Sequence, residues 1–260
     1  VKVIGNKPLQ AISRKDAATV RDDLVAKGLA PSSVTRVLTT IKAVINFAIQ
    51  EEGIELSNPF KGLFVDKSIG PKKRMPVPLN DLQRVQKQCW NVDDDLRWIV
   101  AAISDTGCRM AEIVGLSKAD VRLDGDIPFI SISPKPWRRL KTASSERDIP
   151  LVGSALWGIT RAYQSTNSEM LFPRYNNGLY SNSNSASAAL SKWLKQQTKP
   201  DCTMHSFRHS FRDRLRAVEC PIELTDALGG WSTDGIGAAY GQGYSLELKQ
   251  KWLSAIVLNP

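Results

Sequence analysis

A basic stretch of fourteen residues, 67–80, constrains the fold of this chain more than any other feature. It holds no acidic residue, and one glycine and three prolines interrupt the apolar periodicity that is found on either side. We therefore predict two domains, at 1–66 and 81–260, joined by a linker at 67–80. The cations of this linker are Lys67, Lys72, Lys73 and Arg74.

These cations have two interpretations. A solvated hinge is the plainer one. Flexible cations placed beside a duplex would instead contact its phosphates, and we expect this of Lys72, Lys73 and Arg74.

Helical patterns fill the region before the linker. Residues 13–28 begin with Ser-x-x-Asp and end with glycine, as a short amphipathic helix does. From Pro31 to Gly53, apolar residues recur at helical spacing and predict a longer helix. Small hydroxyls and cations share another face of this helix, where Arg36, Thr39 and Lys42 are our candidates for contact with DNA phosphates. A solvated helix face is an equally good interpretation of this segment alone.

The region after the linker mixes many helices with a few strands. Strand signals occur at 127–133 and 147–151. The sequence thus predicts a mainly α fold with a small antiparallel β-sheet. Further helices are predicted near 79–90, 94–106, 153–165, 184–197, 205–218, 221–228 and 245–257.

The charge balance points to a polyanionic partner. Lysine and arginine number 35 against 26 acidic residues, a formal charge of +9, which favours nucleic acid. The sequence contains no run of about 18 apolar residues, which a membrane span would need. It also shows no cationic amphipathic helix or lipidation signal, which binding to a membrane surface would need.

The cysteines are scattered singly, without the close pairs of a zinc site. With no signal peptide either, we expect a cytoplasmic, nucleoid-associated protein with free thiols. The four cysteines are Cys89, Cys108, Cys202 and Cys220.

Two segments hold residues suited to phosphodiester chemistry, Thr106-Gly107-Cys108-Arg109-Met110-Ala111-Glu112 and His205-Ser206-Phe207-Arg208. Breaking a phosphodiester requires cations for the non-bridging oxygens, a nucleophile, and an acid for the leaving oxygen. The guanidinium group of an arginine can donate two parallel hydrogen bonds to two oxygens of one phosphate. Arg109 begins a helix, and Glu112, three residues on, is placed to hold it; alone, such an arginine is usually only solvated or salt-bridged.

His205 and Arg208 are spaced to lie together on one helix face and to act on one phosphate. Without the downstream residues, a capping or core histidine would be the better interpretation of His205. Metal binding by His205 and His209 is disfavoured because no further ligands are indicated.

Trp231 and Tyr240 follow downstream. A tryptophan offers one N–H donor on an apolar plate, although most tryptophans are simply core residues. A tyrosine hydroxyl with a pKa of about 10 needs a base and cations before it becomes a nucleophile. His205, Arg109 and Arg208 would supply them.

In this order and spacing, the motifs resemble those of the tyrosine recombinases, and the chain looks like a phage-type integrase over residues 13 to about 257. The motifs are the Arg109 segment, Lys141 before Arg147-Asp148-Ile149-Pro150-Leu151, His205-x-x-Arg208, Leu228-Gly229-Gly230-Trp231, and Tyr240. The first domain resembles the family's helical core-binding domain, with Asn58-Pro59-Phe60 at its usual end.

The resemblance implies a mechanism and a set of roles. Tyr240 would attack the scissile phosphate and form a 3′-phosphotyrosyl link, while Arg109 and Arg208 stabilise the transition state. Lys141, in a β-hairpin loop, would protonate the leaving 5′ oxygen, and His205 would assist as base or by positioning. Trp231 stands where most members have a second histidine, which puts its role in proton transfer in doubt.

The resemblance also implies partners and cofactors. The family needs neither a metal nor ATP. It works as a C-shaped clamp on double-stranded DNA and assembles as a tetramer on two DNA sites, with DNA-bending accessory proteins in some systems. The helix at 245–257 would contact a neighbouring copy, or pack on its own domain. An N-terminal arm-binding domain, common in such integrases, is not among these 260 residues.

Several alternatives stay open. Tyr244 competes with Tyr240 as nucleophile, and Lys135 with Lys141 as acid. A type IB topoisomerase-like enzyme shares the chemistry but exchanges no strands, and a non-catalytic DNA-binding regulator would use Tyr240 only for packing. The DNA target, the preference for integration or excision, and the oligomeric state without DNA are not readable from the sequence.

Overall fold

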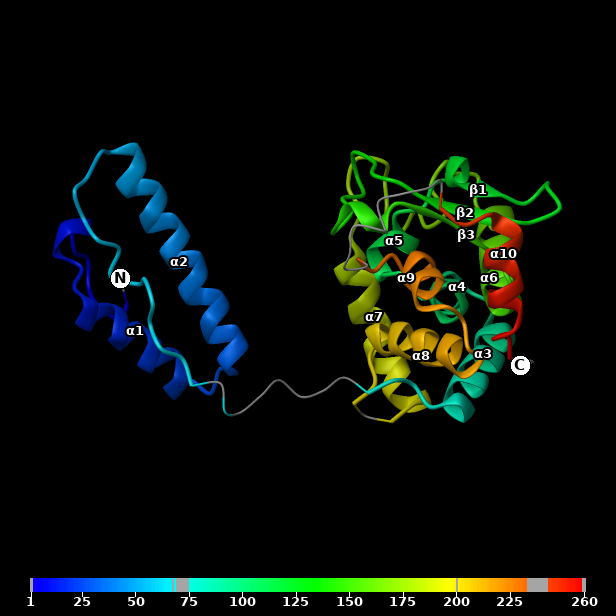
Figure 1. Ribbon diagram of the computed structural model, residues 1–260, viewed down its shortest axis with the longest axis horizontal. Coiled ribbons are helices and arrows are strands. Elements are labelled where there is room, and N and C mark those ends of the chain that lie inside the picture. The colour runs from blue at the N-terminus through cyan, green and yellow to red at the C-terminus, as the bar shows by residue number, and fades with distance from the viewer. Residues whose placement is uncertain (1, 67, 69–74, 200, 233–242, 259–260) are drawn as a thin grey trace. The chain divides into compact units, whose positions relative to one another are not determined.

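The computed structural model describes residues 2–66, 68, 75–199, 201–232 and 243–258. The chain divides into two compact units, Val1–Lys73 and Arg74–Pro260, which are described separately below (Figure 1).

The N-terminal unit is a pair of helices closed by an extended segment. A 3-10 turn, η1 (Leu9–Ala11), precedes α1 (Arg14–Ala26) and α2 (Pro31–Glu51). Ser13 caps α1 and forms the predicted capping box with Asp16. The core of this unit consists of Ala17, Val34, Leu38, Ile45 and Phe60.

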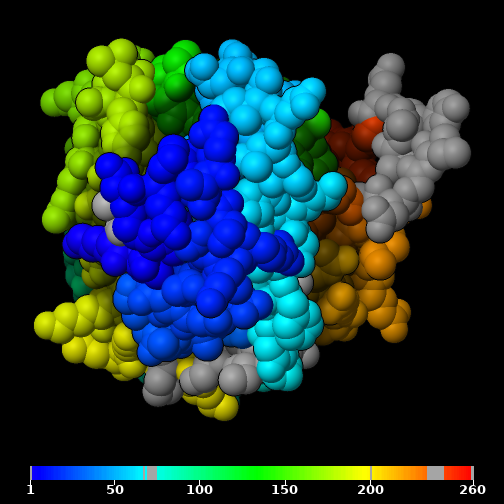
Figure 2. All heavy atoms as spheres, turned by 90° about the vertical axis from the view of Figure 1, so that its left-hand side faces the viewer, coloured from blue at the N-terminus to red at the C-terminus, as the bar shows by residue number. Residues whose placement is uncertain are grey.

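The segment after α2 is fastened to both helices. Asn58 donates to the Lys42 carbonyl and to Asn46 Oδ1, at 2.9 and 2.6 Å, and its own Oδ1 accepts from the Phe60 amide. The Arg14 guanidinium binds the carbonyls of Pro59, Lys61 and Gly62. In the space-filling view the cyan end of this unit accordingly lies against its blue helices (Figure 2).

The C-terminal unit has eight helices and one small sheet among its described residues. The sheet is antiparallel, in the order β1-β2-β3, and pairs Ile132 with Arg147 across β2 and β3. Its strands are β1 (Val121–Arg122), β2 (Phe129–Ile132) and β3 (Arg147–Pro150). Short 3-10 turns are η2 (Lys118–Asp120) and η3 (Ala143–Ser145). The helices are α3 (Leu79–Val92), α4 (Asp95–Thr106), α5 (Met110–Val114), α6 (Gly153–Ser165), α7 (Ser183–Gln197), α8 (Met204–Ala217), α9 (Ile222–Gly229) and α10 (Leu246–Ser254).

The predicted fold class is confirmed, since the described chain is mainly helical with one small antiparallel sheet. Two local features differ from the predictions. Strand β1 was not predicted, because its two residues are too few to show an alternating pattern. The last helix ends at Ser254 instead of 257, and Ile256 and Val257 continue in a turn after it.

Helix α4 forms the centre of this unit. All its residues from Ile99 to Thr106 are buried, and α3, α6 and α8 pack around it. The buried face of α8 includes Phe207, Phe211 and Leu215, whereas Val218, directly after the helix, is only half-buried. All four cysteines are free and buried. None of the helices in the described ranges has both the length and the apolar character of a membrane span.

A buried ion pair joins α4 to α8. Arg214 lies 2.9 Å from Asp105 Oδ1 and also donates to the carbonyls of Ser104 and Ile256. Asp105 in turn accepts from the Gln86 side chain and the Ser154 amide. This one carboxylate therefore connects four helices, and Arg214 adds the turn after α10.

We predict that Arg214→Met lowers the free energy of unfolding by about 3–5 kcal/mol, because it leaves Asp105 charged and buried without its cation. Urea denaturation measures this. As a control, Arg216→Met removes an exposed pair with Asp213 and should leave the unfolding free energy almost unchanged. Equal effects of the two substitutions would contradict this view of the core.

Candidate active site

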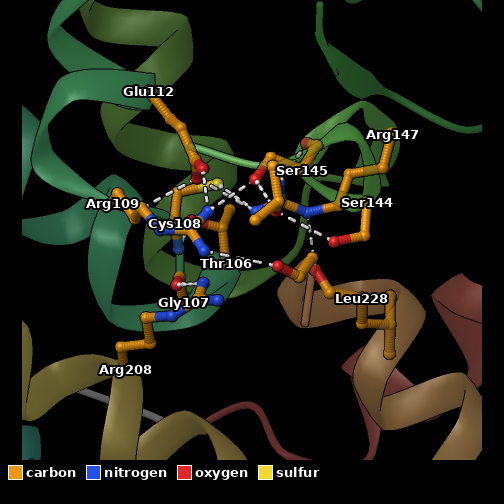
Figure 3. A network of polar contacts seen from close by, with 12 residues as sticks. Thr106, Gly107, Cys108, Arg109, Glu112, Ser144, Ser145, Arg147, Arg208 and Leu228 are labelled. Carbon is orange, nitrogen blue, oxygen red and sulfur yellow. Dashed lines mark hydrogen bonds and ion pairs between the residues drawn. The ribbon is translucent and has the colours of Figure 1, made fainter. Parts of the chain in front are cut away.

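The site is built around the turn between α4 and α5. Gly107 ends α4 with φ +62°, and a Cβ at this position would lie 2.4 Å from the Phe211 ring. Only glycine fits both conditions. The turn places Arg109 at the start of α5, and side chains from β3 and α8 converge on it (Figure 3).

Glu112 is the acidic centre of the site. It is 3% exposed and accepts from Arg109 Nη1 at 2.5 Å, from the Arg109 amide at 2.9 Å and from Arg147 Nη2 at 3.1 Å. Burial alone would raise its pKa, but the charge of Arg147 and the hydrogen bonds from both arginines hold the pKa below its usual value. The carboxylate is therefore ionised and fixes both guanidinium groups.

Arg147 has every nitrogen of its guanidinium occupied. Besides Glu112, it donates to the Leu228 carbonyl at 2.9 Å, to the Ser145 carbonyl at 2.6 Å and to Cys108 Sγ at 3.4 Å. It thus ties β3 to α5 and to the end of α9. Because protein atoms bind all of its nitrogens, Arg147 has a structural role in the site.

Arg208 is buried differently. It is 3% exposed, and Nη1 donates to the Gly107 carbonyl at 2.7 Å. Its Nη2 is buried and has no hydrogen-bond partner in the described structure. Burial, and next the positive charge of Arg109, lower the pKa of Arg208 to about 10. Gly107 lies two residues before Arg109, so Arg208 is attached to the same turn that carries Arg109.

Trp231 contacts two arginines of α8. The centroid of its ring lies 4.2 Å from Arg208 Cζ and 4.7 Å from Arg212 Cζ, and Arg212 is held by Asp226 at 2.9 Å.

The preceding glycines make room for this arrangement. A Cβ on Gly229 would lie 1.8 Å from the Trp231 ring, and a Cβ on Gly230 would lie 2.6 Å from Arg147 Nη1. This explains why Gly-Gly precedes the tryptophan.

Lys141 lies in the connection between β2 and β3, as expected from the sequence, and is exposed. The next residue, Thr142, contacts Ser145 Oγ at 3.0 Å, and that oxygen also accepts from Arg109 Nη1 at 3.0 Å. Lys141 is therefore one residue from a chain of hydroxyls that ends on Arg109. The alternative, Lys135, forms an ion pair with the buried carboxylate of Asp120 at 3.4 Å.

Comparison with known proteins decides the family. A search of curated protein sequences finds no significant match. The profile of the phage integrase family matches residues 80–244, which is more than half of the chain. The chain belongs to this family.

Solved integrase structures share the fold. The Tn1549 transposon integrase, in complex with circular intermediate DNA, is 18% identical with a TM-score of 0.65, over 95% of this chain and 86% of its own. The lambda integrase tetramer bound to a Holliday junction is 19% identical with a TM-score of 0.65, over 92% and 67% of the two chains. A lambda integrase dimer bound to a COC′ core site is 16% identical with a TM-score of 0.63, over 94% and 69%. The resemblance to the tyrosine recombinases is thus confirmed for the fold and the family.

The other predicted site residues of this integrase-family chain lie as follows. His205 is exposed in the first turn of α8, and its ring meets that of His209 edge-on at 5.2 Å. Tyr240 lies outside the described residues, as do Lys72, Lys73 and Arg74. Within the described part of the chain, no three potential metal ligands are grouped so that they could hold an ion.

Tyr244, the rival nucleophile, is described. Its hydroxyl donates to Glu223 Oε2 at 3.1 Å. Burial and this hydrogen bond raise the pKa of Tyr244, which makes its phenolate harder to form and disfavours it as the nucleophile.

The candidate DNA face of α2 is only partly open. Arg36 and Thr39 are exposed, and Thr39 and Lys42 line a groove of about 640 Å³ whose other wall is the segment from Phe60 to Asp66. Asn46, on the same face, is bound by Asn58.

The role of Arg147 was not predicted from the sequence, where this residue stood out only as part of a motif. A signal was available: Arg147 is two residues before the buried Ile149 in β3, and alternate residues of a strand share a face. The partners themselves were not predictable, because Leu228 is 81 residues away.

We predict opposite effects for two buried arginines. Arg147→Met should lower the free energy of unfolding by about 3–5 kcal/mol, because Glu112 loses a buried cationic partner. Arg208→Met should leave it unchanged or raise it, because the substitution removes a buried guanidinium that lacks a full set of partners. Urea denaturation of both variants without DNA tests this, and a large loss for Arg208→Met would show that we misjudge its environment.

Glu112 should make the stability depend on pH. Its pKa is lower in the folded protein than in the unfolded chain, so its contribution is complete above its ordinary pKa of 4.5 and is lost as the pH falls through the lowered value. We expect Glu112→Gln to be less stable at neutral pH and to lose less stability than the wild type between about pH 5 and pH 3. Parallel pH profiles in urea denaturation would contradict this assignment.

Proposed function

We propose that this protein cuts and rejoins DNA strands at specific sites through a 3′-phosphotyrosyl intermediate formed by Tyr240. One observation carries the proposal: the buried Nη2 of Arg208 has no partner in the described structure, while Nη1 of the same side chain binds the Gly107 carbonyl, two residues before Arg109. Arg109 itself binds Glu112, Ser145 and the Gly230 carbonyl. Two guanidinium groups at one turn fit the non-bridging oxygens of one phosphate.

The local charge supports an anion as the ligand. The carboxylate of Glu112 binds the guanidinium groups of Arg109 and Arg147, and a third guanidinium group, that of Arg208, binds the Gly107 carbonyl at the same turn. Arg147 is saturated by protein atoms, so the excess charge lies on Arg208 and on Arg109, whose side chain is 23% exposed. A bound phosphodiester would neutralise part of this excess and supply the missing acceptor for Arg208.

The proposed step conserves atoms and protons. The Tyr240 oxygen attacks phosphorus and passes its proton to His205, while the bond from phosphorus to the 5′ oxygen breaks and that oxygen takes a proton from Lys141. Arg109 and Arg208 stabilise the charge on the non-bridging oxygens. A 5′-hydroxyl of another strand reverses the step and rejoins the DNA. Trp231 holds Arg208 by stacking.

The relatives support the finer assignments by likeness. The Tn1549 and lambda integrase structures are complexes with DNA, and one of them is a tetramer on a Holliday junction. We propose that this protein also acts as a tetramer on DNA. In this proposal residues 1–66 bind the core site, the basic linker 67–80 contacts the backbone and residues 81–260 carry out the chemistry.

Covalent capture tests the proposal. The protein is incubated with a pool of nicked duplexes of randomised sequence, and adducts that resist denaturant are isolated and sequenced. We expect the wild type and Tyr244→Phe to form adducts on a common sequence and Tyr240→Phe to form none. Tyr244→Phe is the matched control, because its hydroxyl is bound to Glu223.

Other outcomes separate the rival functions. An adduct with Tyr240→Phe would show that the nucleophile is wrong. DNA binding without any adduct would favour the non-catalytic regulator. If the protein forms adducts and relaxes a supercoiled plasmid but never joins two captured duplexes, a topoisomerase-like enzyme is favoured.

A further inference from the structure

Arg138, in the connection between β2 and β3, forms a buried ion pair with Asp120 of η2 that the proposed chemistry does not use. Arg138 is 2% exposed, as is Asp120. The Arg138 guanidinium lies 3.1 Å from Asp120 Oδ2 and donates to the carbonyls of Gly115 and Ser133, at 3.2 and 2.9 Å. Isolated buried charges are costly, so these contacts hold the arginine in one place.

The contacts of this pair join the start of the connection to the end of α5. Gly115 directly follows α5, and its carbonyl also accepts from Trp137 Nε1 at 3.0 Å. A Cβ on Gly115 would lie 2.8 Å from Arg138 Cδ, so the glycine allows this close approach. Lys135 adds its ion pair to Asp120.

The far end of the connection is attached to the same helix. Ser145 Oγ accepts from Arg109, which begins α5, and Arg147 binds Glu112 within α5. Helix α5 has only five residues. The six residues between the two attachments, 139–144, include Lys141.

We propose that the Arg138–Asp120 pair positions Lys141 by fixing its loop to the helix that also carries Arg109. Arg138 is a positioning residue, and Lys141 is the group that meets the leaving oxygen. The inference rests on the proposed function and adds to it the ion pair that positions the acid beside the phosphate.

The chemistry of the leaving group offers a selective test. When the bridging 5′ oxygen leaves, it needs a proton from Lys141. When sulfur replaces that oxygen, the bond from phosphorus to sulfur breaks and a thiolate leaves without a proton, because a thiol is far more acidic than an alcohol. Loss of the acid, or of its position, therefore slows cleavage of the oxygen substrate and spares the sulfur substrate.

The test uses the duplex recovered by covalent capture, made with oxygen or with sulfur at the scissile 5′ position. The main variant is Arg138→Met with Asp120→Asn, which removes both buried charges and leaves an amide oxygen to accept from Ser117. Arg138→Lys is the second variant, since it keeps the charge but not the fork. Lys141→Ala defines the effect of losing the acid itself.

The control is Arg161→Met, which breaks an arginine–aspartate pair to Asp93 at 2.7 Å, between side chains that are 42% and 34% exposed. Folding of each variant is checked by urea denaturation and by binding to the same duplex. Single-turnover rates of adduct formation are then compared for the two substrates.

We expect the double variant and Lys141→Ala to slow adduct formation on the oxygen substrate by at least about tenfold, and on the sulfur substrate by less than about twofold. Arg138→Lys should fall between these and the wild type, and Arg161→Met should match the wild type on both substrates. If the double variant is slowed equally on both substrates, or on neither, Arg138 does not position the acid. If Lys141→Ala is not rescued by sulfur, the inference fails as well. If the wild type captures no duplex, the proposed function itself is wrong.

Discussion

The contact between Glu112 and its two arginines is the interaction on which the rest of the site depends. A carboxylate that is 3% exposed is stable as an anion only because Arg109 and Arg147 surround it. In return it aligns α5 with β3, and Arg147 extends the connection to the end of α9 through the Leu228 carbonyl. Three segments far apart in sequence thereby share one electrostatic centre (Figure 3).

Arg208 shows the opposite arrangement. Burial stabilises hydrophobic neighbours such as Phe207 and Phe211, but it penalises a guanidinium group with an unpartnered nitrogen. The surrounding core, including the Arg214–Asp105 pair on the same helix, offsets this local cost. In the proposed reaction a cation is thus already in place in the free protein before the phosphate binds, so that less reorganisation is needed on binding.

Local features of the chain were predictable from the sequence. The capping box at Ser13, the end of α4 at Gly107 and the pairing of Arg109 with Glu112 all depend on residues within a few positions of each other. The distant partners of Arg138 and Arg147 were not predictable, because Asp120 lies 18 residues from Arg138 and Leu228 lies 81 residues from Arg147, and nothing in the local sequence distinguishes such an arginine from an exposed one. Tyr240, which gave the sequence much of its resemblance to the family, remains a prediction.

The register of the small sheet gives it a chemical role. Ile132 lies opposite Arg147, and the guanidinium enters the site from the same face of β3 as the buried Ile149. A shift by one residue would turn Arg147 toward solvent and bring Asp148 inward beside Glu112, replacing an attraction with a repulsion. The protein should therefore tolerate insertions within this four-residue strand less well than it would if the strand only packed in the core.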